Sequence, residues 1–188
     1  MNENPNTAQA QDKKQNKRME TLDWLYCLVF AIVIVILLCT FLIRPIVVYG
    51  SSMVPTLEDR NLVLINLQSG QYHRGDVVVV RKESFMATPI IKRVIATEGE
   101  TVDIDFTEGV VYVDGVALDE PYINAPTHEP EDFTEPVTVP EGCVFVMGDN
   151  RNRSTDSRSA RVGCLDERLI LGKVFLRLTP LNKFGGMK

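Results

Sequence analysis

The serine at position 52 stands in the run 50–57, Gly-Ser-Ser-Met-Val-Pro-Thr-Leu, a few residues after a long apolar stretch. A serine hydroxyl on a turn, flanked by apolar side chains, is suited to attack a carbonyl carbon. Such a hydroxyl is a weak nucleophile until a neighbouring base takes its proton. Ser52 is therefore a candidate nucleophile, and the rest of the chain must supply its base.

Histidine is the usual base for a serine nucleophile, and an aspartate usually holds that histidine in place. The chain has 2 histidines, His73 in a polar turn and His128 in an acidic, proline-rich segment. Neither belongs to a compact motif with an orienting carboxylate. Both are better explained as solvated loop residues, so the sequence favours a base of another type.

Lys92 is the second candidate base, because it stands alone among branched apolar residues in the segment 89–95, Pro-Ile-Ile-Lys-Arg-Val-Ile. In a strand, Ile90, Lys92 and Val94 point to one face. Burial there disfavours the ammonium form and lowers the pKa of the amine. Lowering the pKa from ~10.4 to about 8 requires roughly 3.3 kcal/mol. In the competing interpretation, Lys92 extends its amine into solvent or protects a sheet edge.

A dense polar motif follows the apolar run 143–147 and reads Gly-Asp-Asn-Arg-Asn-Arg-Ser-Thr-Asp-Ser-Arg over 148–158. Such a density of hydrogen-bonding groups is typical of a solvated loop. It is equally compatible with a shell that orients a lysine amine, in which a serine contacts the amine and an aspartate–arginine pair fixes the loop. Composition alone leaves both interpretations open.

The segment 24–43 contains no charged residue and is predicted to form a transmembrane helix. About 20 residues at ~1.5 Å each span roughly 30 Å, the thickness of a bilayer core. A cleaved signal peptide has a shorter apolar core followed by small residues, whereas Arg44 and Pro45 follow here. A buried core helix would carry polar residues on one face. The sequence therefore predicts a single membrane span.

Basic residues flank this span unequally, and their excess marks the cytoplasmic side. Lysine and arginine are more frequent in 1–23 than in the 20 positions after the span, which hold only Arg44 and Arg60. We expect a cytoplasmic tail at 1–23 and an extracytoplasmic domain at 44–188, in a single-pass protein of the cell membrane that contacts the lipid bilayer. The first 16 residues, rich in Asn, Gln and Lys, are expected to be disordered.

Short β-type runs separated by turn signals dominate the chain after position 60. The predicted strands are 62–67, 77–80, 90–96, 101–105, 110–113, 116–118, 143–147 and 173–178. Asp114-Gly115 predicts a hairpin turn, 121–140 is predicted to be a loop, and 166–171 is the one predicted helical turn. The fold class is therefore mostly β, an antiparallel sandwich or half-open barrel behind one helix.

Composition excludes several classes of function. The formal net charge is −5 and no basic stripe occurs, so nucleic acid is not an expected partner. No spacing of cysteines or histidines indicates a metal, and no cofactor is expected. Cys27 and Cys39 fall within the span. Cys143 and Cys164 lie outside it, where a disulfide is permitted but is not dictated by the sequence.

Together, the motifs resemble those of the bacterial type I signal peptidases of peptidase family S26, membrane-anchored Ser-Lys proteases that remove signal peptides. After the anchor come Ser-Met-x-Pro-Thr-Leu at 52–57, Arg-Gly-Asp-Val-Val at 74–78, Ile-Lys-Arg-Val at 91–94 and the motif 148–158. Each motif alone is weak, but four in this order behind one anchor are specific. The compact soluble part resembles the Gram-positive form, whose antiparallel β catalytic domain has a LexA-like fold.

The resemblance implies a role for individual residues. Ser52 is expected to be the nucleophile, Lys92 its general base, and Ser154 a hydrogen-bond partner of the Lys92 amine. Ion pairs that support the site are implied for Asp149, Arg93, Asp156 and Arg158. The Ser52 backbone N–H is expected to donate to the oxyanion. Some relatives place a serine two residues before the nucleophile as a second donor, and here Gly50 stands there.

The family's substrates are secretory preproteins with small residues at the first and third positions before the cut, as in Ala-x-Ala. The residues expected to line shallow apolar pockets for them are Val48, Met53, Leu57, Ile90 and Ile91. The substrate is expected to lie extended along an edge strand of the site, and the export machinery is a candidate partner. Val162-Gly163 stands where relatives often have Phe-Gly, a difference that concerns packing.

Two other functions compete with this one. Ser-Lys autoproteases of the LexA repressor type share the fold, but they are cytosolic and joined to DNA-binding or partner domains. The uncharged span and the lack of a basic domain argue against them. A membrane-tethered β module that binds exported proteins without cleaving them does not require Ser52, Lys92 and Ser154 together. The sequence therefore favours a peptidase.

Overall fold

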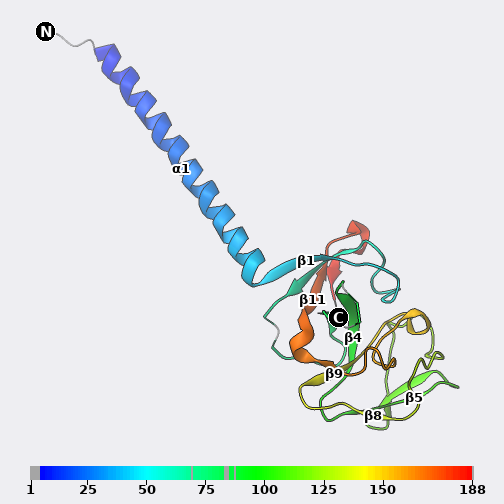
Figure 1. Cartoon of the computed structure of the whole chain (residues 1–188). Coiled ribbons are helices and arrows are strands. Elements are labelled where there is room, and N and C mark those ends of the chain that lie inside the picture. Colours follow the sequence, from blue (N-terminus) through cyan, green and yellow to red (C-terminus); the bar gives the residue numbers. More distant parts are fainter. Residues whose placement is uncertain (1–4, 69, 83–84, 87, 188) are drawn as a thin grey trace. The chain divides into compact units, whose positions relative to one another are not determined.

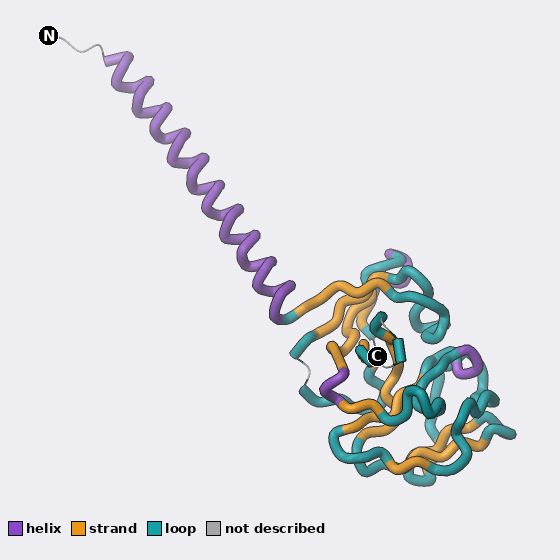
Figure 2. Tube along the Cα trace, viewed as in Figure 1, coloured by secondary structure: helices purple, strands orange, loops and turns teal. Residues whose placement is uncertain are grey.

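The computed structural model describes residues 5–187 apart from 69, 83–84 and 87, with side chains from position 19 onward. The chain divides into two compact units, Met1–Leu42 and Ile43–Lys188. Figures 1 and 2 show that the first unit is one helix and that the second is built mainly from strands and loops. The predicted fold class, mostly β behind one N-terminal helix, is confirmed.

The helix α1 extends over Pro5–Phe41. Its segment Met19–Phe41 is long and apolar enough to cross a membrane. The helix ends at Phe41 rather than at position 43, because Ile43 already belongs to the first strand. The expectation of a disordered tail is wrong for residues 5–16, which are helical. Proline is well tolerated at a first helical position, and the Ala, Gln and Lys that follow are good helix formers.

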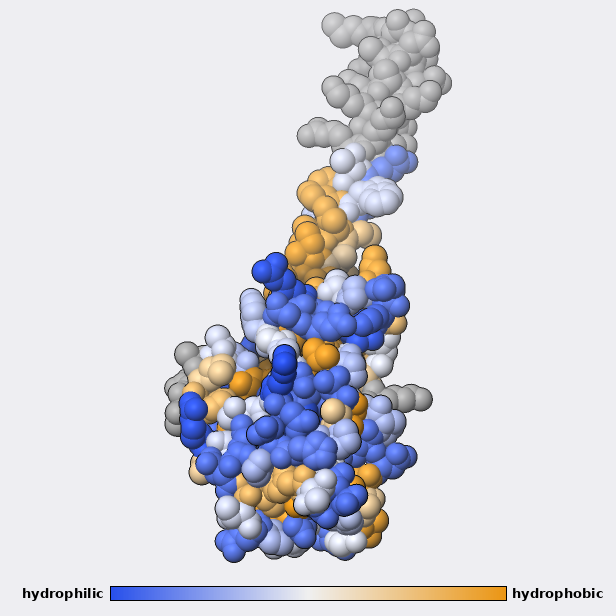
Figure 3. Space-filling view, turned by 90° about the vertical axis from the view of Figure 1, so that its right-hand side faces the viewer, coloured by the Kyte–Doolittle hydropathy of each residue, from blue (hydrophilic) through white to orange (hydrophobic). Residues whose placement is uncertain are grey.

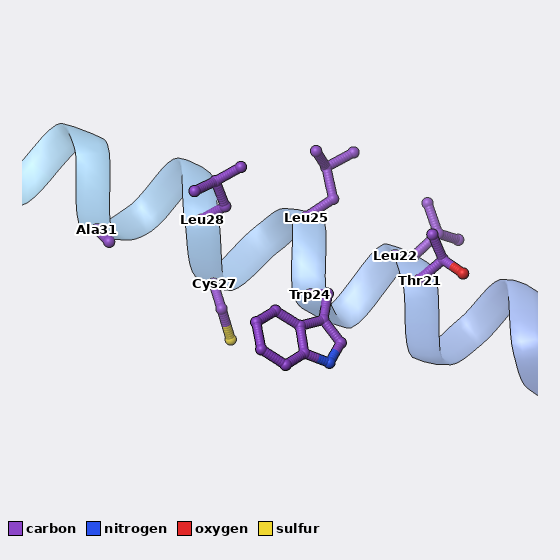
Figure 4. A pocket seen from close by; sticks show the side chains of 7 residues that line it. All are labelled: Thr21, Leu22, Trp24, Leu25, Cys27, Leu28 and Ala31. Carbon is purple, nitrogen blue, oxygen red and sulfur yellow. The ribbon is translucent and has the colours of Figure 1, made fainter.

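Apolar side chains surround the described part of this helix instead of following one face. Figure 4 shows Leu25 and Leu28 on one side of the helix and Trp24 and Cys27 on another. In Figure 3 the helix carries an apolar band, whereas the visible face of the Ile43–Lys188 unit is largely hydrophilic. A helix that is apolar all round is typical of a membrane span.

Within the described residues of the second unit, a large antiparallel sheet has the strand order β1-β2-β11-β3-β4-β9-β10, and β12 pairs with β11 (Figure 1). Its strands are β1 (Ile43–Val47), β2 (Leu62–Asn66), β3 (Val77–Val80), β4 (Ile90–Thr97), β9 (Cys143–Met147), β10 (Leu165–Asp166), β11 (Ile170–Arg177) and β12 (Gly185–Gly186). Strand β4 is paired on both edges, with β3 and with β9. It is therefore an interior strand of this sheet.

A second, smaller sheet has the order β7-β6-β5-β8. Its strands are β5 (Thr101–Asp105), β6 (Val110–Val113), β7 (Val116–Ala117) and β8 (Val137–Thr138). The predicted hairpin turn is confirmed, since Asp114 and Gly115 have φ values of 52° and 75° between β6 and β7. Positive φ at both central residues is characteristic of a tight type I′ turn. Strand β8 lies within 121–140, which the sequence predicted to be a loop throughout.

The other predicted strands are present, although β11 begins three residues before position 173. The predicted turn at 166–171 is the short 3-10 turn Glu167–Leu169, and two further 3-10 turns cover Arg151–Arg153 and Leu181–Lys183. The sequence missed β1, whose Arg44 and Pro45 are poor signals for a strand. Proline lacks an N–H and is tolerated in strands at sheet edges, and β1 stands at the end of the strand order.

Strand β4 is buried from Ile91 to Ala96. Ile91 packs on one face with residues of β2 and β3, and Val94 packs on the other face with β3 and β9. Past a register irregularity, Ile95 and Ala96 join a third apolar cluster with the small sheet. Two polar residues, Lys92 and Arg93, lie inside this apolar strand. Burying a charged group is costly unless it is paired, so both require partners.

Candidate active site

The Ser52 hydroxyl and the Lys92 amine lie next to each other in the second unit. Lys92 Nζ donates a hydrogen bond to Ser52 Oγ over 2.8 Å. Ser52 belongs to the turns that follow β1 and Lys92 to the buried part of β4. The distance is within the reach that a nucleophile and its base require.

Lys92 does not extend its amine into solvent, because only 4% of the residue is exposed. It lies opposite Val78 of β3, so its side chain shares a sheet face with that valine. Burial lowers the pKa of Lys92 to about 8, and the charges of Asp156 and Glu131 oppose this effect. At pH 8 about half of the amine is therefore neutral and able to accept a proton.

The polar motif after β9 holds the backbone of the nucleophile. The Asn150 N–H donates to Ser52 O over 2.9 Å, and Asn150 Nδ2 donates to Ser51 O over 3.0 Å. Gly148 lies beside the same carbonyl: a Cβ on it would stand 2.5 Å from Ser52 O and 2.2 Å from Ser154 Oγ. Both distances are too short for real contacts, so only glycine fits here without displacing Ser52 or Ser154.

A buried ion pair joins β4 to this motif. Arg93 donates from Nε to Asp149 Oδ1 over 2.9 Å and from Nη2 to Asp149 Oδ2 over 2.8 Å. The two side chains are 1% and 0% exposed. Thr56 Oγ1 donates to the same carboxylate. The pair therefore connects the strand of Lys92 with the segment that follows Ser52, and the support predicted for Arg93 and Asp149 has a geometric basis.

A second buried pair lies within the motif. Arg158 donates from Nε to Asp156 Oδ1 and from Nη2 to Asp156 Oδ2, both over 2.9 Å. Asp156 Oδ2 also accepts from the Gly148 N–H over 2.9 Å. Neither side chain of the pair is exposed. Asp156 thereby orders its own loop and acts on Lys92 through its charge.

The predicted hydrogen bond between Ser154 and the Lys92 amine is not formed in the described structure. Ser154 Oγ donates to Asp156 Oδ2 instead, over 2.8 Å. A carboxylate is a stronger acceptor than a neutral amine, because hydrogen bonds to ionised groups are roughly twice as strong. Ser154 therefore belongs to the shell around Asp156 and Gly148, and no hydrogen bond joins its hydroxyl to the Lys92 amine among the described residues.

A third buried pair was missed by the sequence analysis. Arg151 donates from Nη1 to Glu120 Oε2 over 2.7 Å and from Nη2 to Glu120 Oε1 over 2.5 Å. Its Nε donates to Gly148 O over 3.1 Å, next to the Ser52 carbonyl. Arg151 belongs to the recognised motif, but Glu120 lies between strands in a segment without any motif. No local signal marks it as the partner of a buried arginine.

Tyr122 links the first and third pairs. Its ring lies under the Arg93 guanidinium, with 4.0 Å between Arg93 Cζ and the ring centroid. Its hydroxyl donates to Glu120 Oε1 over 3.0 Å. Cation–π contacts of this kind contribute about 0.5–2 kcal/mol. The loop that carries Glu120 and Tyr122 is thus part of the support of the site, which the sequence analysis did not foresee.

A cavity of about 260 Å³ opens onto Ser52 and Lys92. Ile90 and Ile91 line it, as expected for the substrate pocket. The other described residues that line it are Tyr49, Gly50, Ser51, Phe85, Met86, Thr88, Pro89, Arg153 and Thr155. The cavity therefore combines apolar side chains with the nucleophile and its neighbouring amine among its described lining residues.

The other three predicted pocket residues are core residues. Val48, Met53 and Leu57 are 3%, 1% and 0% exposed, and they are not among the described residues that line this cavity. They pack with apolar residues of β2 and β3. The turn that presents the Ser52 hydroxyl directs its apolar side chains inward, because burying them stabilises the turn.

The backbone N–H of Ser52 makes no hydrogen bond to any described group of the protein. Its role as an oxyanion donor stays a prediction that agrees with this lack of a partner. The Gly50 N–H is engaged, because it donates to Asp59 Oδ1 over 2.9 Å, and Gly50 has no side chain to offer.

Neither histidine lines the cavity of Ser52 among its described residues. His73 is an exposed neighbour of Asp76, and His128 Nδ1 contacts Phe106 O over 2.9 Å.

All four cysteines are free thiols, and burial raises the pKa of Cys164 to about 11. The described residues contain no group of three or more His, Cys, Asp or Glu that could hold a metal ion.

A serine hydroxyl against a buried lysine is the arrangement of the serine hydrolases that use lysine in place of histidine. The chain belongs to the signal peptidase family, peptidase S26, whose model matches residues 21–179. It is therefore a serine peptidase, a hydrolase that removes signal peptides from secretory preproteins.

Several relatives share most of their length with this chain. Signal peptidase I of Bacillus licheniformis is 33% identical over 185 residues, 93% of this chain and 97% of the relative. Signal peptidase I T of Bacillus subtilis is 36% identical over 191 residues, 96% of this chain and 95% of the relative. These similarities confirm the Gram-positive type. A solved signal peptidase I from Enterococcus faecalis is 30% identical, with a TM-score of 0.44, and covers 55% of this chain and 96% of its own.

Proposed function

We propose that the protein cuts signal peptides with a Ser52–Lys92 dyad, as an endopeptidase anchored in the cell membrane by α1. The observation that carries this proposal is the 2.8 Å contact between Lys92 Nζ and Ser52 Oγ. It joins a hydroxyl that opens into a cavity to an amine that is 4% exposed. Burying a lysine amine costs free energy. Beside a serine hydroxyl, a buried amine with a lowered pKa can act as a general base.

The reaction begins with the neutral Lys92 amine. It takes the proton of Ser52 Oγ while the oxygen attacks the scissile carbonyl carbon. Lys92, now an ammonium, gives this proton to the leaving amine, and the substrate remains as an ester on Ser52. In the second half, the amine takes a proton from water, which attacks the ester, and the Ser52 oxygen leaves with that proton.

The negative charge of each tetrahedral intermediate needs a hydrogen-bond donor. The unengaged Ser52 N–H is suited to this role, and one such donor is worth about 2.7–4 kcal/mol. Its peptide is held by Asn150 through the neighbouring carbonyls. A donor fixed in this way needs no reorganisation when the charge forms.

The proposed substrates carry small residues at the first and third positions before the cut, as in Ala-x-Ala, because the family resemblance implies them. Ile90 and Ile91 line the space of about 260 Å³ beside Ser52 and offer apolar contacts to such side chains. The substrate would bind extended, with backbone hydrogen bonds to a strand edge beside the site. Many preproteins meet these requirements.

The membrane topology of the chain is also part of this proposal. We propose a cytoplasmic tail at 1–23, a span that begins near position 24 and an extracytoplasmic peptidase domain from 44 to 188. Support comes from the length and composition of Met19–Phe41 and from the excess of basic residues before it. The lipid bilayer and the export machinery are the partners that this arrangement implies.

The test is cleavage of an Ala-x-Ala precursor in detergent by the full chain. We expect Ser52→Ala and Lys92→Ala to lose activity, while Lys183→Ala, which removes an exposed lysine paired with Glu58, retains it. Circular dichroism of each variant verifies folding. Full activity in either dyad variant would contradict the proposed mechanism, and no cleavage by the folded wild type would contradict the substrate class.

A further inference from the structure

Arg153 is an unengaged cation in the cavity of the nucleophile. It stands at the end of the 3-10 turn Arg151–Arg153 and lines the cavity together with Ser52 and Lys92. Its side chain makes no hydrogen bond or ion pair with any described residue, and the residue is exposed. The other arginines of the motif, Arg151 and Arg158, are buried and paired with carboxylates.

The described residues that line the cavity carry charge of one sign. Among its described lining residues, the ionisable groups are the basic side chains of Lys92 and Arg153, and none is a carboxylate. This local excess contrasts with the formal net charge of −5 for the whole chain. Lys92 is partly neutral near pH 8, because burial lowers its pKa to about 8, and Arg153 is the second cation of this lining.

The backbone beneath Arg153 is firmly held. Its N–H donates to Asn150 O over 2.9 Å. On either side, Arg158 Nη2 donates to Arg151 O over 2.6 Å and to Ser154 O over 3.2 Å. The Arg153 backbone is therefore fixed by the same network that orders the site, while its guanidinium has no hydrogen bond or ion pair with a described residue. These contacts give the Arg153 guanidinium no part in stabilising the fold.

We propose that Arg153 is a specificity-determining residue that binds the carboxylate of an aspartate or glutamate of the substrate, close to the scissile bond. This inference rests on the proposed function, because it assumes a peptide in the cavity of Ser52. The guanidinium offers a planar pair of donors that matches a carboxylate. In this arrangement, small substrate residues before the cut contact Ile90 and Ile91, and an acidic substrate residue next to them binds Arg153.

Anionic lipid headgroups offer a similar negative group. The peptide is the favoured occupant because Arg153 shares its cavity with the Ser52 hydroxyl, where the scissile bond must lie. A lipid contact would act on enzyme location and would affect all substrates equally. A peptide contact acts on the relative rates of substrates that differ in one charge.

The experiment uses the full chain in neutral detergent and a set of Ala-x-Ala peptides. At the position before the last alanine and at the two positions after the cut, each peptide carries Asp or its neutral isostere Asn. For the wild type we expect kcat/KM to be about two- to fivefold higher with Asp at one or more positions, the size of an exposed ion pair. The preference should shrink in 1 M salt.

The variants separate the possible causes. In Arg153→Gln the Asp/Asn ratio should fall to about 1, and in Arg153→Glu it should fall below 1. The control is Arg81→Gln, an exposed arginine that is not among the described residues of this cavity, which should keep the wild-type ratio. The ratio is informative even if a variant lowers the overall rate.

Three results would overturn the inference. The wild type could show an Asp/Asn ratio of 1 at every position, or Arg153→Gln could keep the wild-type preference. Alternatively, Arg153→Gln could lower all rates equally, and only with vesicles that contain anionic lipid, which would assign Arg153 to headgroups. In each case cleavage of the neutral Asn peptides continues, whereas failure of the proposed function would abolish cleavage of the whole set.

Discussion

The Asn150 N–H donates to the carbonyl of Ser52 over 2.9 Å, so the peptide of the nucleophile is held by a motif about 100 residues further along the chain. The Asn150 side chain repeats this contact on Ser51. The three buried arginine–carboxylate pairs hold the motif itself. The position of the Ser52 hydroxyl therefore depends on residues that are not among the described residues lining its cavity.

Gly148→Ala is expected to reduce activity strongly. The added Cβ would stand 2.2 Å from Ser154 Oγ and 2.5 Å from Ser52 O, so the turn with Ser52 or the motif must move. Forcing a methyl group into a packed site costs about 1–3 kcal/mol, and we expect a matching loss in the free energy of unfolding together with a fall in kcat. Urea denaturation and precursor cleavage measure both.

The control for this change is Gly185→Ala, where no atom lies within 4 Å of the added Cβ. It should leave kcat unchanged and the free energy of unfolding within about 0.5 kcal/mol. If Gly148→Ala retained full activity, the tight contact between Gly148 and Ser52 would not position the nucleophile.

Activity should rise with pH through the pKa of Lys92. Burial lowers this pKa to about 8, and only the neutral amine accepts the Ser52 proton. Below about pH 8 we expect kcat/KM to fall by about tenfold per pH unit, and above it to level off. The charges that face Lys92 are those of Asp156, Glu131, Asp149 and Arg158. A pH–rate profile that is flat from pH 6 to 9 would contradict a neutral lysine base.

Lys92→Met should abolish activity and yet stabilise the fold at pH 7. The pKa of Lys92 is lower in the folded chain, so the unfolded chain binds the extra proton, and stability contributed by this residue is lost as the pH falls from 10.5 to about 8. The difference between the pKa values of Lys92 in the unfolded and folded chains corresponds to a loss of about 3 kcal/mol in stability at pH 7. Methionine, a neutral side chain of similar length, does not cause this loss.

The measurement is urea denaturation of both proteins at pH 7 and pH 10. The advantage of Lys92→Met should be largest at pH 7 and should shrink at pH 10, where the wild-type amine is largely neutral in the folded chain. A variant that is less stable than the wild type at both pH values would show that the Lys92 amine contributes more through its contact with Ser52 than its burial costs.

The sequence predicted those parts of the site whose signals are local. Lys92 stands out because it interrupts a buried strand. The period of two assigned it to one face with Ile90 and Val94, and Val78 lies opposite Lys92 and packs with Val94. Met53 and Leu57 were misassigned, because an apolar residue beside a nucleophile suits the core as well as a pocket. Only the path of the chain decides between the two, and here it buries both.

Residues that act across long loops had no such signal. Ser154 was expected to contact Lys92, but its hydroxyl donates to Asp156 instead. The orientation of the Asp156 carboxylate decides this contact. Glu120 was not foreseen at all, because its partner Arg151 lies 31 residues further on, beyond β8 and β9. Contacts between residues far apart in the sequence depend on how the loops fold in three dimensions, and the periodicity of the sequence does not predict this.

Glu120→Gln is therefore the sharpest test of the unforeseen part of the site. It keeps the shape of the side chain but leaves the buried Arg151 charge, 0% exposed, without its counter-charge. Removing one partner of a buried pair costs about 3–5 kcal/mol. We expect a loss of this order in the free energy of unfolding, and a fall in kcat because Arg151 also contacts the Gly148 carbonyl.

The matched control is Asp166→Asn, which breaks the pair with Arg168, whose side chain is 89% exposed. Solvent screens an exposed pair, so its effect on stability is small, and an asparagine keeps an oxygen for the Arg168 N–H. This variant should therefore remain close to the wild type in stability and in kcat. The double variant Glu120→Gln, Arg151→Met should recover part of the stability lost in Glu120→Gln, because it removes the uncompensated charge. If Glu120→Gln were no more destabilising than Asp166→Asn, the Glu120–Arg151 pair would not support the motif that holds Ser52.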